Sequence, residues 1–548
     1  MVDRCRRFAG SNTALALALI VVTAVFALVR MQFWMGDLIP IYSPDSQTYL
    51  AVAFDISRGI WPSLDLRTPG YPLTLYAVLE MTGSVRVMVL LQQLATLLSA
   101  YALCIACFLV RRSLVLISLV PAAAIVGSRR AQAYELWILP EAIYSATVVV
   151  AFACLLAGLA RRSSKALMLS SIAMGTAILF RPSGLFLIGT YALTVVALCL
   201  GGFRRDQITK FAAPMPVILL ALCSYNYATI DKFTVSPFGP ANLAAATATF
   251  WTEVPGFPDL VNRTIRETQQ EVSREDRETL KSGDWDPVRL DSVFRRYYNQ
   301  FLWFRIIPAL DSVGVQGMSA QVPYLSTISK SAIASDPFSY LKFVSTSAYM
   351  LLESMTRPDE AINRSNSYVR LYGQPRYLAD GVFAGYRSQL RYLERPDRLA
   401  AFRTFALREF ETPPALSAGI VPPGNGAEDS EDGMGWTQVA DRYDRFVHSP
   451  LYVGIGWVVV LVASAIVSVA FLLSSRRDED RMLAHFGLIA FLSALGSILL
   501  TALVEVGSAR YLHPTRFLFY LAPLVMVAIG LQFRARAKDP SKPSLDSI

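Results

Sequence analysis

Apolar residues in this sequence gather into long runs that are separated by short polar stretches. A transmembrane helix needs about 20 apolar residues to cross roughly 30 Å of hydrocarbon. Ten runs approach that length, at residues 13–30, 86–110, 113–128, 141–160, 166–181, 183–201, 211–229, 451–474, 483–504 and 515–533. The pattern predicts an all-α polytopic membrane protein with about ten transmembrane helices, of which 113–128 and 166–181 are the shortest.

The segment between the first two runs, 31–85, has a different pattern. The first run is followed by "RMQFWMGDL" and not by a small-residue cleavage site, so we expect it to stay as a membrane span. Further on, "RTPGYPLTLYAVLEMTG" is too short and too interrupted by proline to cross the bilayer. We therefore expect 31–85 to form a juxtamembrane loop.

Basic residues predict the orientation of the spans, because loops that stay in the cytoplasm carry an excess of Lys and Arg. With the N-terminus inside, the inner loops carry Arg111, Arg112, Arg161, Arg162, Lys165, Arg204, Arg205, Lys210, Arg476, Arg477, Arg481, Arg534, Arg536, Lys538 and Lys542. This orientation places both termini in the cytoplasm and the 31–85 loop outside.

The long stretch 230–450 interrupts the apolar runs and is expected to be an outward-facing hydrophilic insert. It holds 27 of the chain's 42 acidic residues, so water must solvate it. Within it, 262–305 predicts a polar helix, a break and an amphipathic helix, 336–354 a helix on the outer bilayer surface, and 412–435 a Pro/Gly-rich loop. We expect three parts: a catalytic membrane module at 1–229, the insert at 230–450, and C-terminal membrane helices with a cytoplasmic tail at 451–548.

Composition narrows the function classes. The chain is 53% hydrophobic and 17% charged, with a mean hydropathy of +0.40, as expected for a membrane protein. Its net charge of +9 comes from short basic pairs and not from a continuous patch, so no nucleic-acid partner is expected. Five of the six cysteines lie inside apolar runs, which excludes a disulfide framework, and three histidines are too few for a His-rich metal site.

Ionisable residues collect where the predicted spans meet the outer surface. They are Asp45, Asp55, Asp65, Arg67, Arg129, Arg130, Glu135, Glu141, Arg181, Glu505, Arg510 and Arg516. The span interiors carry almost none, whereas an ion-coupled transporter places carboxylates near the midplane. The pattern favours a site at the outer membrane–water boundary, for a substrate with a lipid tail and a polar head.

Each of these charges also has an explanation without function. Asp45 suits the first helical turn after Ser43, and Glu141 begins a helix after Pro140, where an acid favours the helix dipole. Arg181 in "FRPSG" can satisfy carbonyl groups at a helix end. Their shared side and depth favour a joint role, because charge this close to hydrocarbon is costly without a partner.

The order of several short motifs resembles a known family. "SPDSQTYL" follows the first span, "RTPGYP" and "LPEAIYS" come next, and "RPSG", "YNYATIDKFTVSPFGPANL" and "EVGSARYLHP" follow in that order. This set resembles the GT-C superfamily of polyprenyl-phosphate-sugar-dependent glycosyltransferases, near the protein O-mannosyltransferases and the lipid A aminoarabinose transferase. It covers about 10–240 and 450–530. Many members carry a second acid beside the first, where this chain has Ser46, which weakens any two-carboxylate metal site there.

The resemblance implies a fold, a reaction and a set of site residues. It implies a GT-C-like fold and an inverting transfer of a sugar from a polyprenyl-phosphate donor to a lipid, polysaccharide or protein acceptor on the outer face of the plasma (inner) membrane. Asp45 resembles the family's catalytic base, with Glu141 as the second candidate carboxylate. The candidate donor-phosphate ligands are Arg67, Arg181 and Arg510, and the candidate substrate pocket comprises Asp55, Tyr71, Glu505 and Tyr511, with Trp137 as a further pocket or interface residue.

Two alternatives and a cofactor expectation remain at this stage. The other function class is a transporter or flippase of lipid-linked saccharides, and a non-catalytic scaffold leaves the rim charges unexplained. No tightly held metal is expected, since arginines can neutralise a phosphate. An Mg²⁺ or Mn²⁺ ion between a carboxylate and the phosphate is the alternative, because these ions prefer oxygen ligands.

Overall fold

The protein is an all-α polytopic membrane protein in its computed structural model. The structure describes residues 12–34, 40, 44–60, 67–282, 285–353, 455–474, 478–504, 515, 517–523 and 525. Helices and loops make up these ranges, and no β-strand occurs in them. Six helices there are long and apolar enough to cross a membrane: Asn12–Met31, Val85–Val110, Glu141–Arg161, Pro182–Leu200, Arg205–Ile230 and Arg481–Val504.

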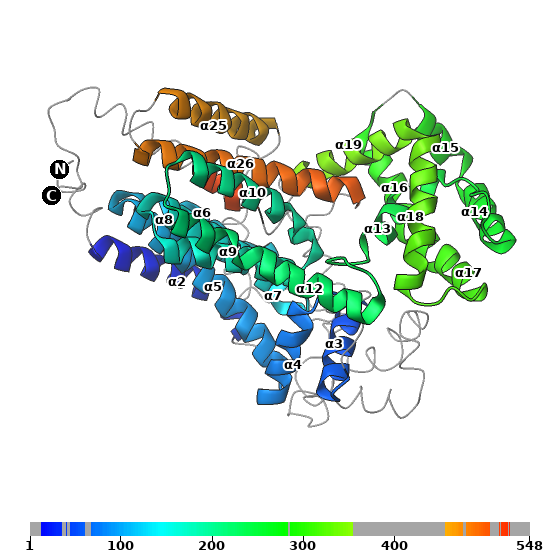
Figure 1. The fold of residues 1–548 in the computed structure, drawn as a ribbon, viewed down its shortest axis with the longest axis horizontal. Helices are drawn as coiled ribbons and strands as arrows, with labels where there is room; N and C mark the ends of the chain where they lie inside the picture. The colour runs from blue at the N-terminus through cyan, green and yellow to red at the C-terminus, as the bar shows by residue number, and fades with distance from the viewer. Residues whose placement is uncertain are drawn as a thin grey trace, which may run out of the picture.

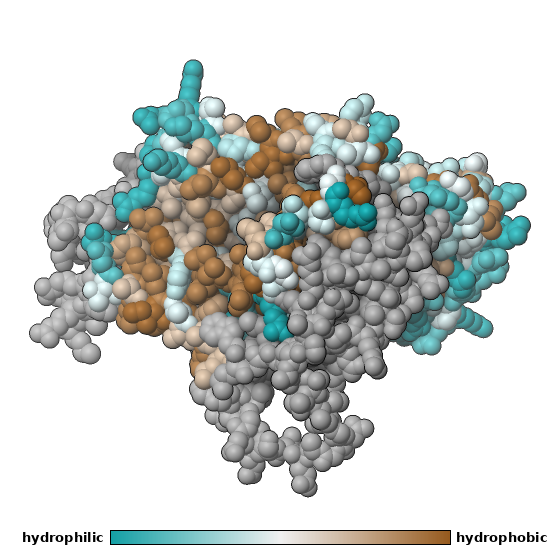
Figure 2. Space-filling view, turned by 90° about the horizontal axis from the view of Figure 1, so that it is seen from below, coloured by the Kyte–Doolittle hydropathy of each residue, from teal (hydrophilic) through white to brown (hydrophobic). Residues whose placement is uncertain are grey.

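The long helices form a bundle that corresponds to nine of the ten predicted spans (Figure 1). Most of the tenth, 515–533, lies outside the described residues. The members of the bundle are α2 (Asn12–Trp34), α5 (Val85–Val110), α6 (Val115–Gly127), α8 (Glu141–Arg161), α9 (Ser164–Phe180), α10 (Phe186–Leu200), α12 (Pro214–Ile230), α25 (Ile455–Ser474) and α26 (Asp478–Val504). α8 lies between α5 and α9 and has the most buried side chains of the six long helices. Figure 2 shows a broad hydrophobic surface over the bundle, as expected where lipid replaces water.

Short elements connect the bundle helices. At the end predicted to face outward lie α3 (Pro44–Ser57), α4 (Gly70–Thr82), α7 (Arg129–Leu136) and η2 (Pro182–Leu185). At the opposite end lie η1 (Arg112–Leu114) and α11 (Arg205–Ala212). The predicted juxtamembrane loop therefore contains two helices, and α3 begins at Pro44, where the sequence predicted a helix start.

The described part of the insert is helical and has its own core. It contains α13 (Gly239–Ala246), η3 (Ala248–Phe250), α14 (Asp259–Glu271), α15 (Arg274–Lys281), α16 (Pro287–Phe301), η4 (Leu302–Ile306), α17 (Ile307–Ser312), α18 (Met318–Ser335) and α19 (Pro337–Glu353). The core includes Trp251, Phe294, Phe301, Leu325 and Phe343. We call residues 231–353 the outer subdomain.

One detail differs from the sequence expectation and one agrees with it. The stretch 262–305 contains three helices, because Ser273 accepts a hydrogen bond from the Asp276 amide at 3.1 Å and starts α15 as a separate helix. The helix expected at 336–354 is α19, which packs along α26 and against α16. The loop expected at 412–435 lies outside the described residues, and the division at 229/230 and 450/451 stays a prediction.

Candidate functional site

Asp45 and Arg67 form an ion pair at the end of the bundle that is predicted to face outward. Arg67 Nη2 donates to Asp45 Oδ1 at 2.7 Å, and its Nε donates to Thr48 Oγ1 at 2.6 Å. Thr48 in turn donates to the Asp45 carbonyl at 2.8 Å. The Asp45 side chain is 33% exposed. Its carboxylate is thus oriented by Arg67 and still within reach of a substrate.

Glu141 and Arg181 form a second ion pair, which is buried. Glu141 is the first residue of α8, and Arg181 directly follows α9. Arg181 Nη1 lies 2.6 Å from Glu141 Oε1, and the two side chains are only 8% and 2% exposed. A buried charge is costly without a partner, so each of these residues depends on the other.

Tyr49 contacts the first ion pair and lies within electrostatic range of the second. The Arg67 guanidinium carbon is 4.7 Å from the centre of its ring, within cation–π distance, and the Tyr71 ring meets it edge-on at 5.2 Å. Burial raises the pKa of the Tyr49 hydroxyl; Asp45 and Glu141 raise it further, while Arg67 and Arg181 lower it. All four charges therefore act on one phenol, which stays protonated at neutral pH.

Gly70 lies at the contact between α4 and α9. It begins α4, three residues after Arg67, and packs against the last turn of α9, next to Arg181. A Cβ atom there would lie 2.7 Å from the Leu179 carbonyl oxygen. Only glycine permits this approach of α4 to α9, so the "RTPGYP" element places Arg67 near Arg181.

Buried hydrogen bonds hold the segment 135–141 that leads to Glu141. Gln92 on α5 donates to the carbonyls of Glu135 at 2.7 Å and Trp137 at 2.9 Å. Its side-chain oxygen accepts from the Tyr71 hydroxyl at 2.9 Å. Tyr71, a predicted pocket residue, is fully buried. It thus supports the segment that carries Glu141.

Arg30 at the end of α2 holds the other end of this segment. Its Nε and Nη2 donate to the two Glu135 carboxylate oxygens at 2.7 and 2.5 Å, and both side chains are fully buried. It also donates to the Val126 carbonyl at 2.6 Å. Sequence reasoning placed Glu135 at the rim but missed Arg30, Gln92 and Tyr49. The sequence places Tyr49 one helical turn after Asp45, and this spacing could have identified Tyr49 as a neighbour of the Asp45 carboxylate.

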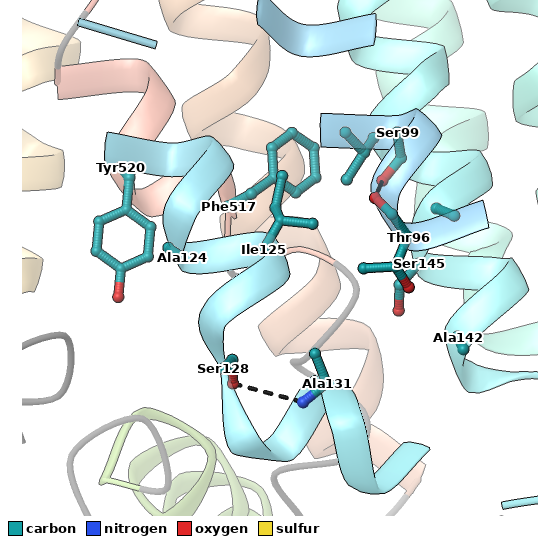
Figure 3. A pocket seen from close by; sticks show the side chains of 12 residues that line it. Thr96, Ser99, Ala124, Ile125, Ser128, Ala131, Ala142, Ser145, Phe517 and Tyr520 are labelled. Carbon is teal, nitrogen blue, oxygen red and sulfur yellow. Dashed lines mark hydrogen bonds between the residues drawn. The ribbon is translucent and has the colours of Figure 1, made fainter. Parts of the chain in front are cut away.

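A small cavity lies beside the start of α8 (Figure 3). Thr96 and Ser99 of α5, Ser128, and Ala142 and Ser145 of α8 contribute to its lining, and Figure 3 shows Phe517 and Tyr520 beside it. Its volume is about 40 Å³. One water needs about 10–15 Å³, so a few waters fit, but not a sugar ring.

Of the remaining predicted site residues, one lies farther along α3 and three lie outside the described residues. Asp55 lies ten residues beyond Asp45 on α3, a rise of about 15 Å along a helix. Glu505, Arg510 and Tyr511 lie outside the described residues, as do Asp65 and His513. Within the described ranges, no group of three or more His, Cys, Asp or Glu side chains is placed to hold a metal ion.

Comparison with protein-family models gave no match, and comparison with curated proteins gave none either. Among solved structures, the chain is similar to the Archaeoglobus fulgidus oligosaccharyltransferase, whose crystal structure carries a tethered acceptor peptide, with 11% identity and a TM-score of 0.37. The match covers 98% of this chain and 52% of that one, so this chain spans about half its length. At these values the comparison assigns neither a family nor an activity.

Proposed function

We propose that the chain is an inverting glycosyltransferase that moves a sugar from a polyprenyl-phosphate donor to an acceptor on the outer face of the membrane. The observation that carries the proposal is the pair of carboxylate–arginine contacts, Asp45–Arg67 and Glu141–Arg181, gathered around Tyr49 beside the apolar bundle. The motif order in the sequence supports the same reaction.

The chemistry needs few groups. An acceptor hydroxyl attacks the anomeric carbon while the bond from that carbon to the phosphate oxygen breaks, and the polyprenyl phosphate leaves with the bonding electrons. Asp45 takes the hydroxyl proton, because a base must come within hydrogen-bond distance of it and Asp45 is the more exposed carboxylate. Arginine stabilises the charge that develops on the leaving phosphate.

The two ion pairs have different roles in this proposal. Arg67 orients Asp45 and adds positive charge near the donor phosphate. Glu141 holds Arg181 at the site, since its own side chain is nearly inaccessible. The Tyr49 hydroxyl, kept protonated by its surroundings, is a hydrogen-bond donor beside the first pair. Arg510, Glu505 and Tyr511 remain proposed contributors to donor and pocket binding, and Asp55 to the pocket.

The partners follow from the reaction. The donor is a polyprenyl-phosphate sugar, the acceptor is a glycolipid, a polysaccharide or a protein of the cell envelope, and the enzyme is a multi-pass protein of the plasma membrane. Catalysis requires no metal in this proposal, because the arginines neutralise the phosphate.

Cells that lack the gene provide the test. Mass spectrometry of their surface lipids, polysaccharides and proteins should show one molecule that lacks a single sugar residue. The lipid-linked donor should accumulate. The wild-type gene and a control variant, Glu253→Gln, should restore the product, because Glu253 is an exposed acid of the outer subdomain. Asp45→Asn should not restore it.

Transport gives a different result. A transporter or flippase, reconstituted into lipid vesicles, would move the intact donor across the vesicle membrane without forming a new glycosidic bond. An intact donor that only changes leaflet, with no glycosylated product in the presence of envelope acceptors, would refute the transferase proposal.

A further inference from the structure

Helix α19 has two contrasting faces. On one face Phe343 and Leu351 are fully buried, with Ser347 between them. On the other face Phe338, Leu341 and Tyr349 are 77%, 60% and 39% exposed. Residues 338, 341, 345 and 349 recur every three or four positions, so they share one side of the helix. The exposed side is a continuous strip, and we call it the α19 strip.

The α19 strip carries no charge, unlike other exposed surfaces of the same subdomain. On α15, the side chains of Arg274, Glu275 and Glu278 are 93%, 80% and 65% exposed. The Lys342 ammonium on α19 is turned aside and donates to the carbonyls of Leu280 and Ser282. A helix face in water is normally polar, so the strip and α15 face different surroundings.

The start and the end of α19 pack into different hydrophobic cores. Tyr340 and Phe343, near its start, pack in the core of the outer subdomain. Leu351, near its end, belongs to the core of the bundle, and Ala348 and Leu352 pack against that core. The helix therefore runs from the outer subdomain into the level of the membrane bundle, as Figure 1 shows beside the outer end of α26.

Helix α26, against which α19 packs, also has an exposed apolar face. Leu495, Leu499 and Leu503 are 40%, 48% and 40% exposed along α26, one of the candidate spans. The Tyr340 hydroxyl donates to the Leu503 carbonyl at 2.7 Å, which joins the start of α19 to the last turn of α26. From that contact α19 runs back along α26, so Tyr349 lies nearer the bilayer centre than Leu341.

An aromatic pair lies near the C-terminal end of the α19 strip. The rings of Trp285 and Tyr349 meet edge-on at 5.6 Å, and both side chains are partly exposed. Trp and Tyr are enriched where lipid headgroups meet hydrocarbon, because their rings are amphipathic. Together with the uncharged strip, this pair fits a phospholipid leaflet better than water.

We propose that the second half of α19 is inserted into the bilayer leaflet that surrounds the outer end of α26, with the α19 strip in contact with lipid. This replaces the sequence expectation of a helix lying along the surface: α19 enters the leaflet beside α26. The outer subdomain is thereby anchored to lipid as well as to the bundle. The inference does not depend on the proposed reaction.

Single cysteines in a cysteine-free version of the full chain test the insertion. Leu341→Cys, Ser345→Cys and Tyr349→Cys each receive a nitroxide label after reconstitution into phosphatidylcholine–phosphatidylglycerol nanodiscs. Accessibility to oxygen, which concentrates in hydrocarbon, is compared with accessibility to a water-soluble nickel chelate. Leu499→Cys on α26 is the lipid-facing control and Arg274→Cys on α15 the water-facing control.

The expected result is a gradient. The ratio of oxygen to nickel accessibility should rise from 341 through 345 to 349 and approach the value at 499, while 274 stays low. Ser345→Cys changes one atom, so it should preserve packing even if Tyr349→Cys disturbs the contact with Trp285. Ratios at 341 and 345 like that at 274 would overturn the proposal. So would low accessibility to both probes, which would mean that protein covers the strip.

Discussion

Asp45 and Glu141 are both carboxylates paired with an arginine, yet their surroundings separate their chemistry. One third of the Asp45 side chain is exposed, whereas Glu141 is almost completely enclosed. A base must approach the proton that it removes, and a buried carboxylate that already neutralises Arg181 is poorly placed for that. In the proposed reaction, Asp45 is therefore the base and Glu141 the residue that holds Arg181.

Asp45→Asn tests the first of these roles. If Asp45 is the base, turnover should fall by roughly 10²–10⁴. The variant loses both the favourable acid in the first turn of α3 and the ion pair with Arg67, which together should cost about 0.5–2 kcal/mol of stability. Turnover and thermal unfolding of the purified protein measure the two effects. Nearly normal turnover in the folded variant would remove Asp45 from the mechanism.

Glu141→Gln, in contrast, should strongly reduce the stability of the protein. It leaves the Arg181 charge buried without its counter-charge, which typically costs about 3–5 kcal/mol. The double variant Glu141→Gln, Arg181→Met removes both charges and should recover part of that stability. Chemical denaturation of the single and double variants in detergent measures the difference. If the single variant is as stable as the wild type, the pair does not support the site.

Metal removal is the third prediction at this scale. The two arginines supply positive charge where a divalent ion would otherwise be needed. Purified enzyme should therefore keep its activity in excess EDTA. Loss of activity that Mn²⁺ or Mg²⁺ restores would instead place an ion between a carboxylate and the donor phosphate.

At the scale of elements, the approach of α4 to α9 depends on one glycine. Gly70→Ala would bring a Cβ to 2.7 Å from the Leu179 carbonyl oxygen and 3.0 Å from the Phe180 nitrogen. Backbone atoms cannot rotate away, so α4 must shift and carry Arg67 with it. We expect a loss of about 1–3 kcal/mol, as for other overpacked sites, together with reduced turnover.

Gly189→Ala is the matched control. Gly189 lies inside α10, and a Cβ there meets nothing within 4 Å. The same substitution should be neutral or slightly stabilising, because alanine favours a helix by about 1 kcal/mol over glycine. Thermal unfolding and turnover of both variants measure whether the loss is specific to Gly70. Equal effects at 70 and 189 would show that the contact with α9 is unimportant.

At the scale of the whole molecule, the site and the outer subdomain lie at the same end of the bundle (Figure 1). The Tyr298 hydroxyl donates to the Val504 carbonyl at 3.0 Å and Tyr340 donates to Leu503, so α16 and α19 are fastened to the end of α26. The outer subdomain is thus held at a defined position relative to the helices that carry the site.

Topology is the prediction at this scale. Basic residues concentrate between alternate spans, so reporter fusions should place residues 163 and 206 inside and residues 280 and 400 outside. Residue 280 is in α15 and residues 163 and 206 are at the opposite end of the bundle. A cytoplasmic signal from position 280 would reverse the orientation and contradict the proposed outer site.

The sequence by itself determined the helices of the bundle. An apolar run of sufficient length must form a helix in lipid, because every backbone group has to be satisfied within the segment. Local signals were equally informative at "SPDS", where α3 begins at Pro44, and at "LPEAIYS", where α8 begins at Glu141. These features depend on neighbours a few residues away, so they can be read from the chain.

Only the tertiary structure decided which charges meet. Arg67 pairs with Asp45 across 22 residues, and Arg30 pairs with Glu135 across 105. Charged residues at one depth have many potential partners, and the packing of α4 on α9 through Gly70 selects among them. Tyr49 and Gln92 were missed for the same reason. Either residue is unremarkable in an apolar helix, and becomes part of the site only when distant helices enclose it.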